Sequence, residues 1–377
     1  MIIERLSQLA DPALCPRIVL KVGSALLVER GGGVRGEWLA SLVAEIAEAQ
    51  ARGQQVVVVS SGAIALGAAR LGLAKGGRAS LADAQAAAAV GQIALAGTWA
   101  ELLAGHGLTA AQLLLTIDDL EDRRRYLNAA STLARLLESG AVPVVNENDS
   151  VATAEIRFGD NDRLAARVAQ AARADAVVLL SDVDGLFDRD PKDPGAALVR
   201  EVAGIDETIR AMASGGSASG MGSGGMVSKL QAAELAGRAG IALAIVNGTH
   251  RAPIARALGQ GTGTLFLAQR RDGGRKAWLG GRLAPAGVLT VDTGCADALA
   301  AGSSLLAAGV VGVDGDFARG DLVTIHSAKG DRLAQGLVEY AAADCRAIAG
   351  RKAAEQAEIL GYAPRAAVVH RDHMVLL

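Results

Sequence analysis

Polar and glycine residues stand at the ends of five short apolar runs in this chain. Gly23 and Gly62 follow the runs Arg17–Val22 and Gln55–Ser60 closely. The other three run-and-end pairs are Ala141–Asn146 with Glu147-Asn148-Asp149, Ala176–Ser181 with Asp182, and Ile241–Asn247 with Gly248-Thr249. Open parallel sheets bind ligands outside the carboxyl ends of their strands. One such end could be ordinary turn chemistry, but five in one chain favour a ligand site.

A glycine-rich segment suggests that the ligand carries phosphate. Ser214–Lys229 reads SGGSASGMGSGGMVSK and leads into a stretch with helical spacing, Val227–Arg238. Glycines let backbone N–H groups approach a phosphate, and a helix N-terminus adds partial positive charge. Lys229 is expected in the first helical turn, where a cation opposes the helix dipole, so a phosphate partner would explain its position. A flexible Gly/Ser linker is the alternative.

Two familiar nucleotide motifs do not fit this segment. A P-loop needs Gly immediately before Lys, and Ser228 stands there. Gly220, Gly222 and Gly225 spell GxGxxG, but no strand immediately precedes them and no acid follows about twenty residues on. A nicotinamide-binding site is therefore weakly supported.

Two further groups of residues could bind an anion or its partner. Lys21 lies near the end of the first apolar run, just before Gly23 and Ser24, which resembles a phosphate site that glycine keeps open. The sequence Phe158-Gly159-Asp160-Asn161-Asp162 precedes a helical stretch, Asn161–Ala172. One of its polar residues is expected to cap that helix, but three are more than a cap needs.

The spacing of apolar residues predicts the elements that position these groups. The apolar runs alternate with longer stretches of helical spacing, such as Glu37–Arg52 and Arg123–Ser139. This alternation predicts a parallel sheet covered by helices on both faces over residues 1–270. Residues 271–286 are rich in Arg, Gly and Pro and read as a linker. Residues 287–377 carry short strand-like pieces at Val288–Val291, Val310–Val313, Leu322–His326 and Gly336–Tyr340, which predict a small, mostly β domain.

The composition is that of a globular protein with no global preference for nucleic acid or membrane surfaces. Apolar residues make up 51% of the 377 and charged residues 21%, and the net charge is −2. The three cysteines are far apart, which argues against a disulfide framework or a zinc site and favours a cytoplasmic setting. The Ala-rich stretch Leu81–Leu103 is the one membrane suspect, but four polar residues within it favour a buried helix: Asp83, Gln85, Gln92 and Glu101.

Taken in order, the segments KVGS, SSGA, NENDSVATAEI, FGDND, LLSDVDGLF and GSGGMVSK resemble the glutamate 5-kinase branch of the amino acid kinase family. The resemblance extends over essentially the whole chain. NEND and GDND, followed by the glycine segment ending in Lys229, are typical of this branch rather than of its aspartate or acetylglutamate relatives. The C-terminal part, around Val291-Asp292-Thr293-Gly294, is similar to a PUA domain. Ser223 and Ser228 replace threonines that are usual in the family, and both keep a hydroxyl.

The resemblance implies an α/β fold, a three-layer αβα sandwich with a mostly parallel sheet, followed by a small mostly-β PUA domain. It implies that Ser61, Asp149 and Asn161 bind glutamate, and that Lys21, Lys229 and Asp162 serve catalysis. The residues that would hold ATP are Lys21, Ser181, Asp182, Ser223, Gly224, Gly225, Met226, Val227, Ser228 and Lys229.

The implied activity is transfer of the γ-phosphoryl group of ATP to the γ-carboxylate of glutamate, the first step of proline biosynthesis. The resemblance also implies magnesium, feedback inhibition by proline, and a homo-oligomer of two or four chains. A glutamyl phosphate reductase is a candidate partner, because the acyl phosphate product is labile. No residue is assigned as a metal ligand, since Mg²⁺ would be held mainly by phosphate oxygens and water.

Elementary chemistry agrees with these roles. A γ-carboxylate is already ionised at neutral pH, so it needs no general base. Transfer then depends on alignment and on charge stabilisation, which Lys21 and Lys229 can provide while Asp162 holds their ammonium groups. Asp149 suits the α-ammonium of the acceptor.

Two other functions are weighed against this one. A kinase of the same fold could act on aspartate or acetylglutamate; an acid at Asp149 argues against acetylglutamate, whereas motifs alone do not separate glutamate from aspartate. PUA domains elsewhere recognise RNA, but Val288–Leu377 has 8 Lys/Arg and 11 Asp/Glu, a formal charge of 8 − 11 = −3. Phosphate backbones demand the opposite sign, so nucleic acid is not the expected partner.

Overall fold

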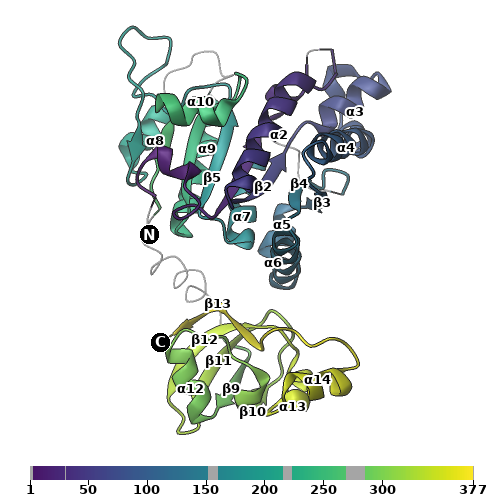
Figure 1. Ribbon diagram of the computed structural model, residues 1–377, viewed down its shortest axis with the longest axis vertical. Coiled ribbons are helices and arrows are strands. Elements are labelled where there is room, and N and C mark those ends of the chain that lie inside the picture. Colours follow the sequence, from purple (N-terminus) through teal and green to yellow (C-terminus); the bar gives the residue numbers. More distant parts are fainter. Residues whose placement is uncertain (1–2, 30, 152–159, 215–222, 269–284, 377) are drawn as a thin grey trace. The chain divides into compact units, whose positions relative to one another are not determined.

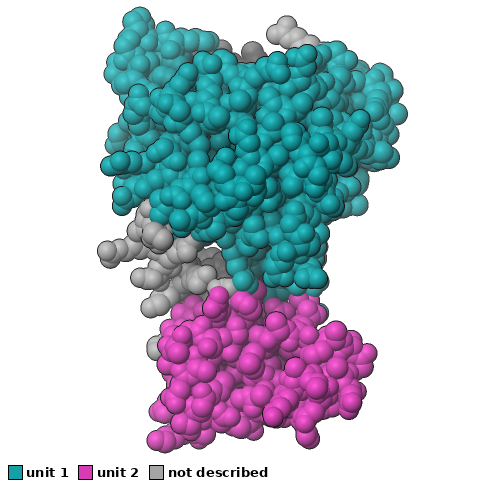
Figure 2. All heavy atoms as spheres, in the orientation of Figure 1, with its two compact units in different colours: residues 1–271 teal, residues 272–377 magenta. Residues whose placement is uncertain are grey.

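The computed structural model describes residues 3–29, 31–151, 160–214, 223–268 and 285–376 (Figure 1). The chain divides into two compact units, Met1–Arg271 and Asp272–Leu377 (Figure 2). The linker predicted at residues 271–286 lies almost entirely outside the described residues.

An eight-stranded sheet forms the centre of the first unit, in the order β3-β4-β2-β1-β5-β7-β8-β6. Only the pairing of β7 with β8 is antiparallel among the strand pairs of this described sheet. The predicted mostly parallel sheet is therefore confirmed. The strands are β1 (Arg17–Val22), β2 (Gln55–Ser60), β3 (Ala110–Leu115), β4 (Val142–Glu147), β5 (Ala176–Ser181), β6 (Glu201–Val202), β7 (Ala242–Asn247) and β8 (Thr264–Phe266).

The two faces of this sheet bury alternate residues of each strand, as strand geometry requires. Val19 and Val177 belong to one apolar core, and their neighbours Leu20 and Val178 belong to the other. The first core is completed by α5 (Ile117–Glu121), α6 (Arg123–Glu138), α7 (Asp160–Ala172), α8 (Glu207–Ser214) and α9 (Ser223–Arg238). The second is completed by η1 (Leu6–Ala10), α1 (Ser24–Leu27), α2 (Gly36–Ala51), α3 (Ala63–Leu71), α4 (Leu81–Ala104) and α10 (Pro253–Gln260). Helices thus cover both faces, giving three layers (Figure 1).

Two glycines let α3 and α4 cross with their backbones in contact. A Cβ atom on Gly67 would lie 1.8 Å from the carbonyl oxygen of Ala87. A Cβ on Gly91 would lie 1.8 Å from the carbonyl oxygen of Ala63, the first residue of α3. Any larger residue would push the two helices apart, so the glycines fix α4 against the start of α3.

Helix α4 is only partly buried, in contrast to the buried helix predicted for this stretch. Leu95, Trp99 and Leu103 pack into the core, whereas the side chain of Ile93 is 76% exposed. Among the described residues, α4 is the one helix that is long and apolar enough to cross a membrane by length and composition. A third of its most apolar window is buried inside the unit.

The second unit is a five-stranded sheet in the order β10-β9-β11-β12-β13. Its strands are β9 (Gly287–Val291), β10 (Val310–Gly315), β11 (Leu322–Ser327), β12 (Arg332–Val338) and β13 (Val369–Leu376). Among its described residues, three short helices accompany them: α12 (Thr293–Ala300), α13 (Ala342–Ile348) and α14 (Ala353–Leu360). The prediction of a separate, mostly β C-terminal domain is confirmed.

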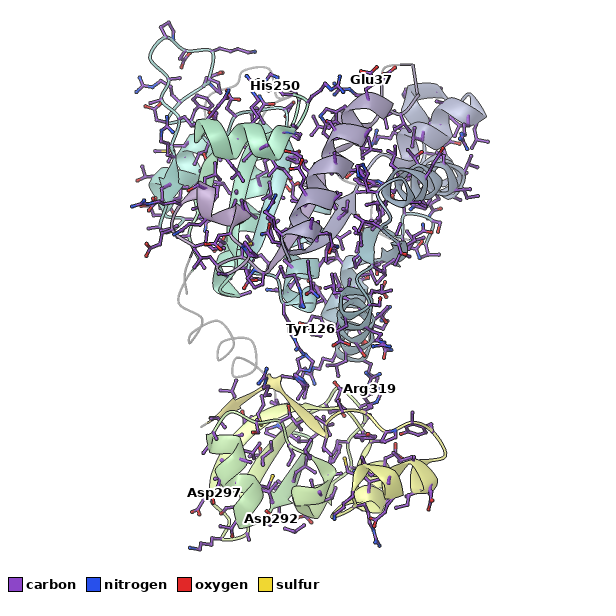
Figure 3. The ribbon with its side chains drawn as sticks, viewed as in Figure 1. Glu37, Tyr126, His250, Asp292, Asp297 and Arg319 are labelled. Atoms are coloured by element: carbon purple, nitrogen blue, oxygen red, sulfur yellow. The ribbon has the colours of Figure 1, made fainter. Side chains whose placement is uncertain are left out.

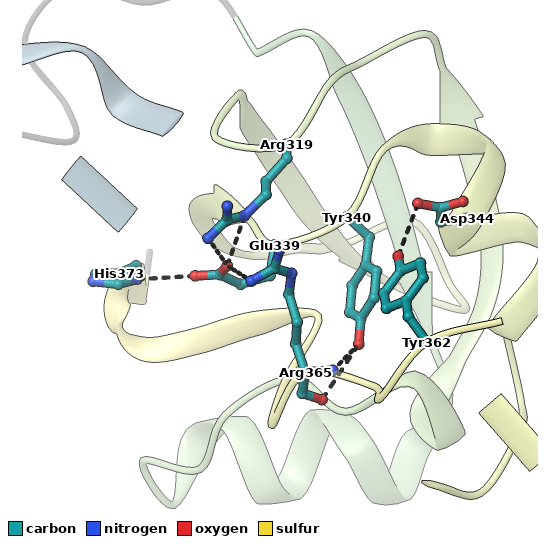
Figure 4. Close-up of polar contacts among 7 residues, drawn as sticks. All are labelled: Arg319, Glu339, Tyr340, Asp344, Tyr362, Arg365 and His373. Atoms are coloured by element: carbon teal, nitrogen blue, oxygen red, sulfur yellow. Dashed lines mark hydrogen bonds and ion pairs between the residues drawn. The ribbon is translucent and has the colours of Figure 1, made fainter. Parts of the chain in front are cut away.

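A half-buried carboxylate, Glu339, adds polar contacts to the apolar core of the second unit. Glu339 accepts two hydrogen bonds from Arg319, at 3.2 and 3.1 Å, and also faces Arg365 and His373 (Figure 4). Burial alone would raise the pKa of Glu339, but the neighbouring His373 and Arg319 outweigh it and hold that pKa below its usual value.

Candidate active site at the carboxyl edge of the first sheet

The carboxyl ends of β1, β2, β4 and β5 open into one cleft of about 310 Å³. The fifth polar strand end, after β7, is not among the described residues that line it. The polar and glycine residues of the lining are Lys21, Gly23, Ser24, Ser61, Gly62, Arg78, Asn146, Glu147, Asp149, Asn161, Asp162, Ser181, Asp182, Gly225 and Lys229.

Two lysines share a single buried carboxylate at the floor of this cleft. Lys21 Nζ lies 2.7 Å from Asp162 Oδ1, and Lys229 Nζ lies 3.2 Å from Asp162 Oδ2. The carboxylate is 1% exposed and the two lysine side chains are 10% and 13% exposed. One negative charge balances only one of the two ammonium groups. The trio therefore carries a net charge of about +1 with little solvent to screen it, which favours binding of an anion.

The fold explains why three residues so far apart in sequence meet. Lys21 is two positions beyond Val19 on β1, so it lies on the sheet face covered by α7 and α9. Asp162 stands in the first turn of α7, and Lys229 comes from α9. Because α9 begins at Ser223 rather than at the predicted Val227, Lys229 lies in the second turn. The repulsion between Lys229 and the helix dipole is thus weaker than predicted. Asp162 forms an ion pair with Lys229.

Asn161 presents an unpaired acceptor beside this charged trio. Its Nδ2 donates to Ser61 Oγ at 2.6 Å and to the carbonyl oxygen of Ser60 at 3.3 Å. Its Oδ1 is buried and has no hydrogen-bond partner among the described residues. A buried acceptor without a partner costs free energy, so this oxygen is suited to a donor that arrives with a ligand.

The residues predicted for the acceptor are thereby brought together. Ser61 precedes Gly62, whose φ of +106° favours glycine and turns the chain into α3. Asp149 is buried and lines the same cleft as Ser61 and Asn161.

The residues predicted to hold the nucleotide are only partly described. Ser181 donates to Asp182 Oδ1 at 3.2 Å, and both line the cleft together with Gly225. Ser228 is buried, while Met226 and Val227 are not among the described lining residues. Ser223 and Gly224 begin α9, but the side chain of Ser223 and residues 215–222 of the glycine segment lie outside the description.

Helix α2 holds the loop that follows β7 next to Ser181. Trp38 Nε1 donates to the carbonyl oxygens of Gly248, at 2.7 Å, and His250, at 3.0 Å. Gly248 N in turn donates to the carbonyl oxygen of Ser181 at 2.7 Å. Glu37 of α2 and His250 of the loop lie at the same end of the unit (Figure 3). The strand end after β7 therefore supports Ser181 from behind and is not among the described residues that line the cleft.

A buried carboxylate on α2 anchors the far side of this loop. Glu45 accepts hydrogen bonds from the backbone N–H groups at the start of α10, at 2.6 and 3.3 Å. Burial raises the pKa of Glu45, and these hydrogen bonds offset part of that rise.

Four polar residues of the cleft have no role assigned from the sequence: Ser24, Arg78, Asn146 and Glu147. Asn146 and Glu147 belong to a predicted strand end, so position alone could have drawn attention to them. Arg78 follows the short 3₁₀ turn η2 (Ala74–Gly77) between α3 and α4, in a region where no apolar pattern or motif indicates a site.

Comparison with known proteins agrees with this geometry. Residues 16–247 match the model of the amino acid kinase family, and residues 287–360 match that of the PUA domain. A glutamate 5-kinase of Novosphingobium aromaticivorans is 65% identical over 377 residues, which is 100% of both chains. Glutamate 5-kinases of Sphingopyxis alaskensis and Zymomonas mobilis are 62% and 54% identical, covering 98% and 97% of this chain and 100% and 92% of their own. The chain therefore belongs to the amino acid kinase family, to the branch whose members are named glutamate 5-kinase, and it carries a C-terminal PUA domain.

Proposed function

We propose that this chain transfers the γ-phosphoryl group of ATP to the γ-carboxylate of L-glutamate, giving L-glutamyl 5-phosphate and ADP. The observation that carries the proposal is one cleft that joins a cationic Lys21–Asp162–Lys229 trio to the unpaired Asn161 Oδ1. The trio suits a phosphoryl group in transfer, and the oxygen suits an ammonium group. The names of the full-length relatives support the same activity.

The acceptor needs orientation rather than activation. Its γ-carboxylate is ionised at neutral pH and is the nucleophile without help from a base. Asn161 Oδ1 and Asp149 accept hydrogen bonds from the α-ammonium group, and Ser61 lines the same part of the cleft. This arrangement directs the γ-carboxylate, at the other end of glutamate, toward the two lysines.

In the transition state the transferred phosphoryl group carries negative charge on its equatorial oxygens, which preorganised cations stabilise. Lys21 and Lys229 supply those cations. Asp162 keeps both ammonium groups in place, so no reorganisation is needed as charge develops. ATP lies along Ser181, Asp182 and the start of α9, from Ser223 through Lys229.

Magnesium would reach this site together with the nucleotide. Among the described residues no group of three His, Cys, Asp or Glu side chains could hold a metal ion, and Asp162 is already paired with two lysines. Mg²⁺ keeps most of its water and is commonly held by substrate phosphates. The residues present fit an ion that would be carried mainly by ATP oxygens and would supply additional positive charge there.

The remaining proposals concern context. We infer a cytoplasmic enzyme at the first step of proline biosynthesis, inhibited by proline at or near the glutamate site. We also infer a homo-oligomer of two or four chains, supported by the exposed apolar residues Ile93 of α4 and Leu114 of the edge strand β3. A glutamyl phosphate reductase would consume the labile product.

The proposed activity is tested by ATP turnover with Mg²⁺ in the presence of hydroxylamine, which traps an acyl phosphate as a coloured hydroxamate. Glutamate, aspartate and N-acetylglutamate are offered separately. The proposal expects hydroxamate from glutamate alone and its suppression by proline. Hydroxamate from another acid would keep the mechanism and change the acceptor, and none from any acid would refute the proposal.

A further inference from the structure

Helix α4 reaches the back of the acceptor site through one polar side chain. Gln92 Oε1 accepts a hydrogen bond of 2.8 Å from Asn146 Nδ2. Asn146 is buried and lines the cleft, whereas Gln92 does not line it and instead lies in the wall of an adjoining pocket. Gln92 is thus one residue removed from the ligand.

Backbone groups fix the direction of both amides in this chain of contacts. The backbone N–H of Glu147 donates to Asn146 Oδ1 at 2.9 Å. A backbone N–H can only donate, so the oxygen of Asn146 must face it, and the Nδ2 group must face Gln92. Gln92 therefore supplies an acceptor, its Oε1, to a buried donor.

The same logic orients Asn161. Its Nδ2 lies 3.3 Å from the carbonyl oxygen of Ser60, which can only accept, and 3.3 Å from Asn146 Oδ1. The amide nitrogen must face these two oxygens, which leaves Asn161 Oδ1 as the unpaired acceptor. The direction of Asn146 therefore helps decide which atom Asn161 offers to a ligand.

A second contact from α4 holds Ser60, whose carbonyl oxygen accepts a hydrogen bond from Asn161. Trp99 Nε1 donates to Ser60 Oγ at 3.0 Å, and both side chains are fully buried. The neighbouring Gly91 presses the backbone of α4 against the carbonyl oxygen of Ala63, which lines the cleft. Gln92 is consequently held at a fixed distance from Asn146.

We propose that Gln92 is a positioning residue for the acceptor's α-ammonium group, acting through Asn146 to keep Asn161 Oδ1 unpaired and turned toward the ligand. The inference rests on the proposed function, because it assumes an amino acid in the cleft. Without the oxygen of Gln92, Asn146 Nδ2 is left as a buried donor that lacks its acceptor. The Asn146 amide is then expected to rotate. Asn161 Nδ2 would lose Asn146 Oδ1 as an acceptor.

The experiment compares glutamate with glutarate, which has both carboxylates and lacks the α-amino group. Gln92→Met keeps most of the side-chain volume and removes the acceptor oxygen. We expect kcat/KM for glutamate to fall about 10- to 100-fold. Glutarate, measured as a substrate or as a competitive inhibitor, should be bound as well as by the unchanged chain, and KM for ATP should stay the same.

Two further variants separate positioning from support of the fold. Gln92→Glu keeps an acceptor oxygen toward Asn146 and should retain most of the preference for glutamate over glutarate. Gln50→Met makes the same exchange on α2, at a half-buried position that is not among the described residues lining either pocket, and should leave all constants unchanged. If Gln92→Met fails to fold, Gln92→Leu is used in its place, and the ratio of its affinities for glutamate and glutarate is measured.

The outcomes are distinct. An equal loss for glutamate and glutarate, or no loss for either, would overturn the role of Gln92. A selective loss with glutamate that Gln92→Glu restores would establish it. Absence of hydroxamate from glutamate with the unchanged chain would instead refute the proposed function itself.

Discussion

Two ammonium groups share one carboxylate in the proposed active site. A lysine that lay alone in this cleft would be drawn toward water, whereas Asp162 fixes both nitrogens through separate oxygens. The pair of lysines is therefore preorganised for a doubly contacted anion, because Asp162 balances only one of the two positive charges.

Replacing one lysine should affect the transition state more than acceptor binding. We propose that Lys229 contacts the phosphoryl group and not the acceptor's ammonium group. Lys229→Ala should therefore lower kcat about 10²- to 10³-fold with KM for glutamate nearly unchanged. Steady-state kinetics with hydroxamate detection measures both constants. Lys192→Ala, on an exposed loop, is the matched control. An unchanged kcat for Lys229→Ala would remove Lys229 from the catalytic residues.

The sequence predicted which residues meet in the cleft better than how they meet. The family resemblance predicts that Lys21, Asp162 and Lys229 act together, and the structure brings the three side chains into contact. The orientation of the Asn161 amide could not be predicted, because it is decided by the carbonyl of Ser60 and by Asn146, which approach from other strands. Gln92 was beyond prediction for the same reason: a glutamine in an Ala-rich helix carries no local sign of its partner.

At the scale of elements, the contact between α3 and α4 links the acceptor site to the outer surface of the unit. Helix α3 begins at Ala63, which lines the cleft, and α4 carries both Gln92 and the exposed Ile93. The position of α4 therefore determines the geometry of the site, and the two crossing glycines determine the position of α4.

Two glycines on α4 provide a matched test of this crossing. Gly91→Ala places a methyl group against the backbone of Ala63 and should destabilise the unit by about 3 kcal/mol or more, with a loss of glutamate affinity. Gly97→Ala places the same methyl group in open space on the same helix and should stabilise it by about 0.5–1 kcal/mol. Urea unfolding measures both, and equal effects of the two substitutions would contradict a tight crossing.

Strands with branched apolar residues were predictable, and strands without them were not. β1, β2 and β5 begin and end where the apolar runs do, because Val and Ile favour a pleated, buried surface. β3 reads AAQLLL, a composition that favours helix, and becomes a strand only through its parallel pairing with β4. β13 contains two histidines, an arginine and an aspartate, and its pairing with β12 overrides that polar composition.

At the scale of the whole molecule, the two units have cores of different kinds. The first depends on two apolar layers around a parallel sheet. The second is smaller and adds the half-buried Glu339 with its arginine partners to its apolar core (Figure 4). Its stability should therefore respond to pH through that one carboxylate.

The sign of this response follows from the lowered pKa of Glu339. Between the folded pKa and the ordinary value near 4.5, the unfolded chain binds more protons, so stability rises with pH in that window and is fully present above it. Glu339→Gln should destabilise the second unit by about 2 kcal/mol at pH 7.5, because two arginines lose their counter-charge, and much less at pH 3.5. Labelling of the buried Cys345 with a pyridyl disulfide during urea unfolding follows this unit. A difference that is larger at pH 3.5 would contradict the assignment.

The division into two units was also open to prediction, because the alternation of strands and helices stops near Gln269 and short strand-like runs follow. The three short helices of the second unit were not predicted, since eight residues or fewer give too little periodicity to recognise.

The central claim is that a carboxylate oxygen of the acceptor attacks the γ-phosphorus of ATP, and labelled oxygen tests it most directly. Glutamate carrying ¹⁸O in its γ-carboxylate is turned over with ATP and Mg²⁺, and hydroxylamine then attacks the acyl carbon and expels phosphate with the bridging oxygen. The released phosphate should then carry one ¹⁸O atom, seen as an isotope shift in its ³¹P resonance. Phosphate without ¹⁸O would mean that water, not glutamate, had taken the phosphoryl group, and would contradict the account.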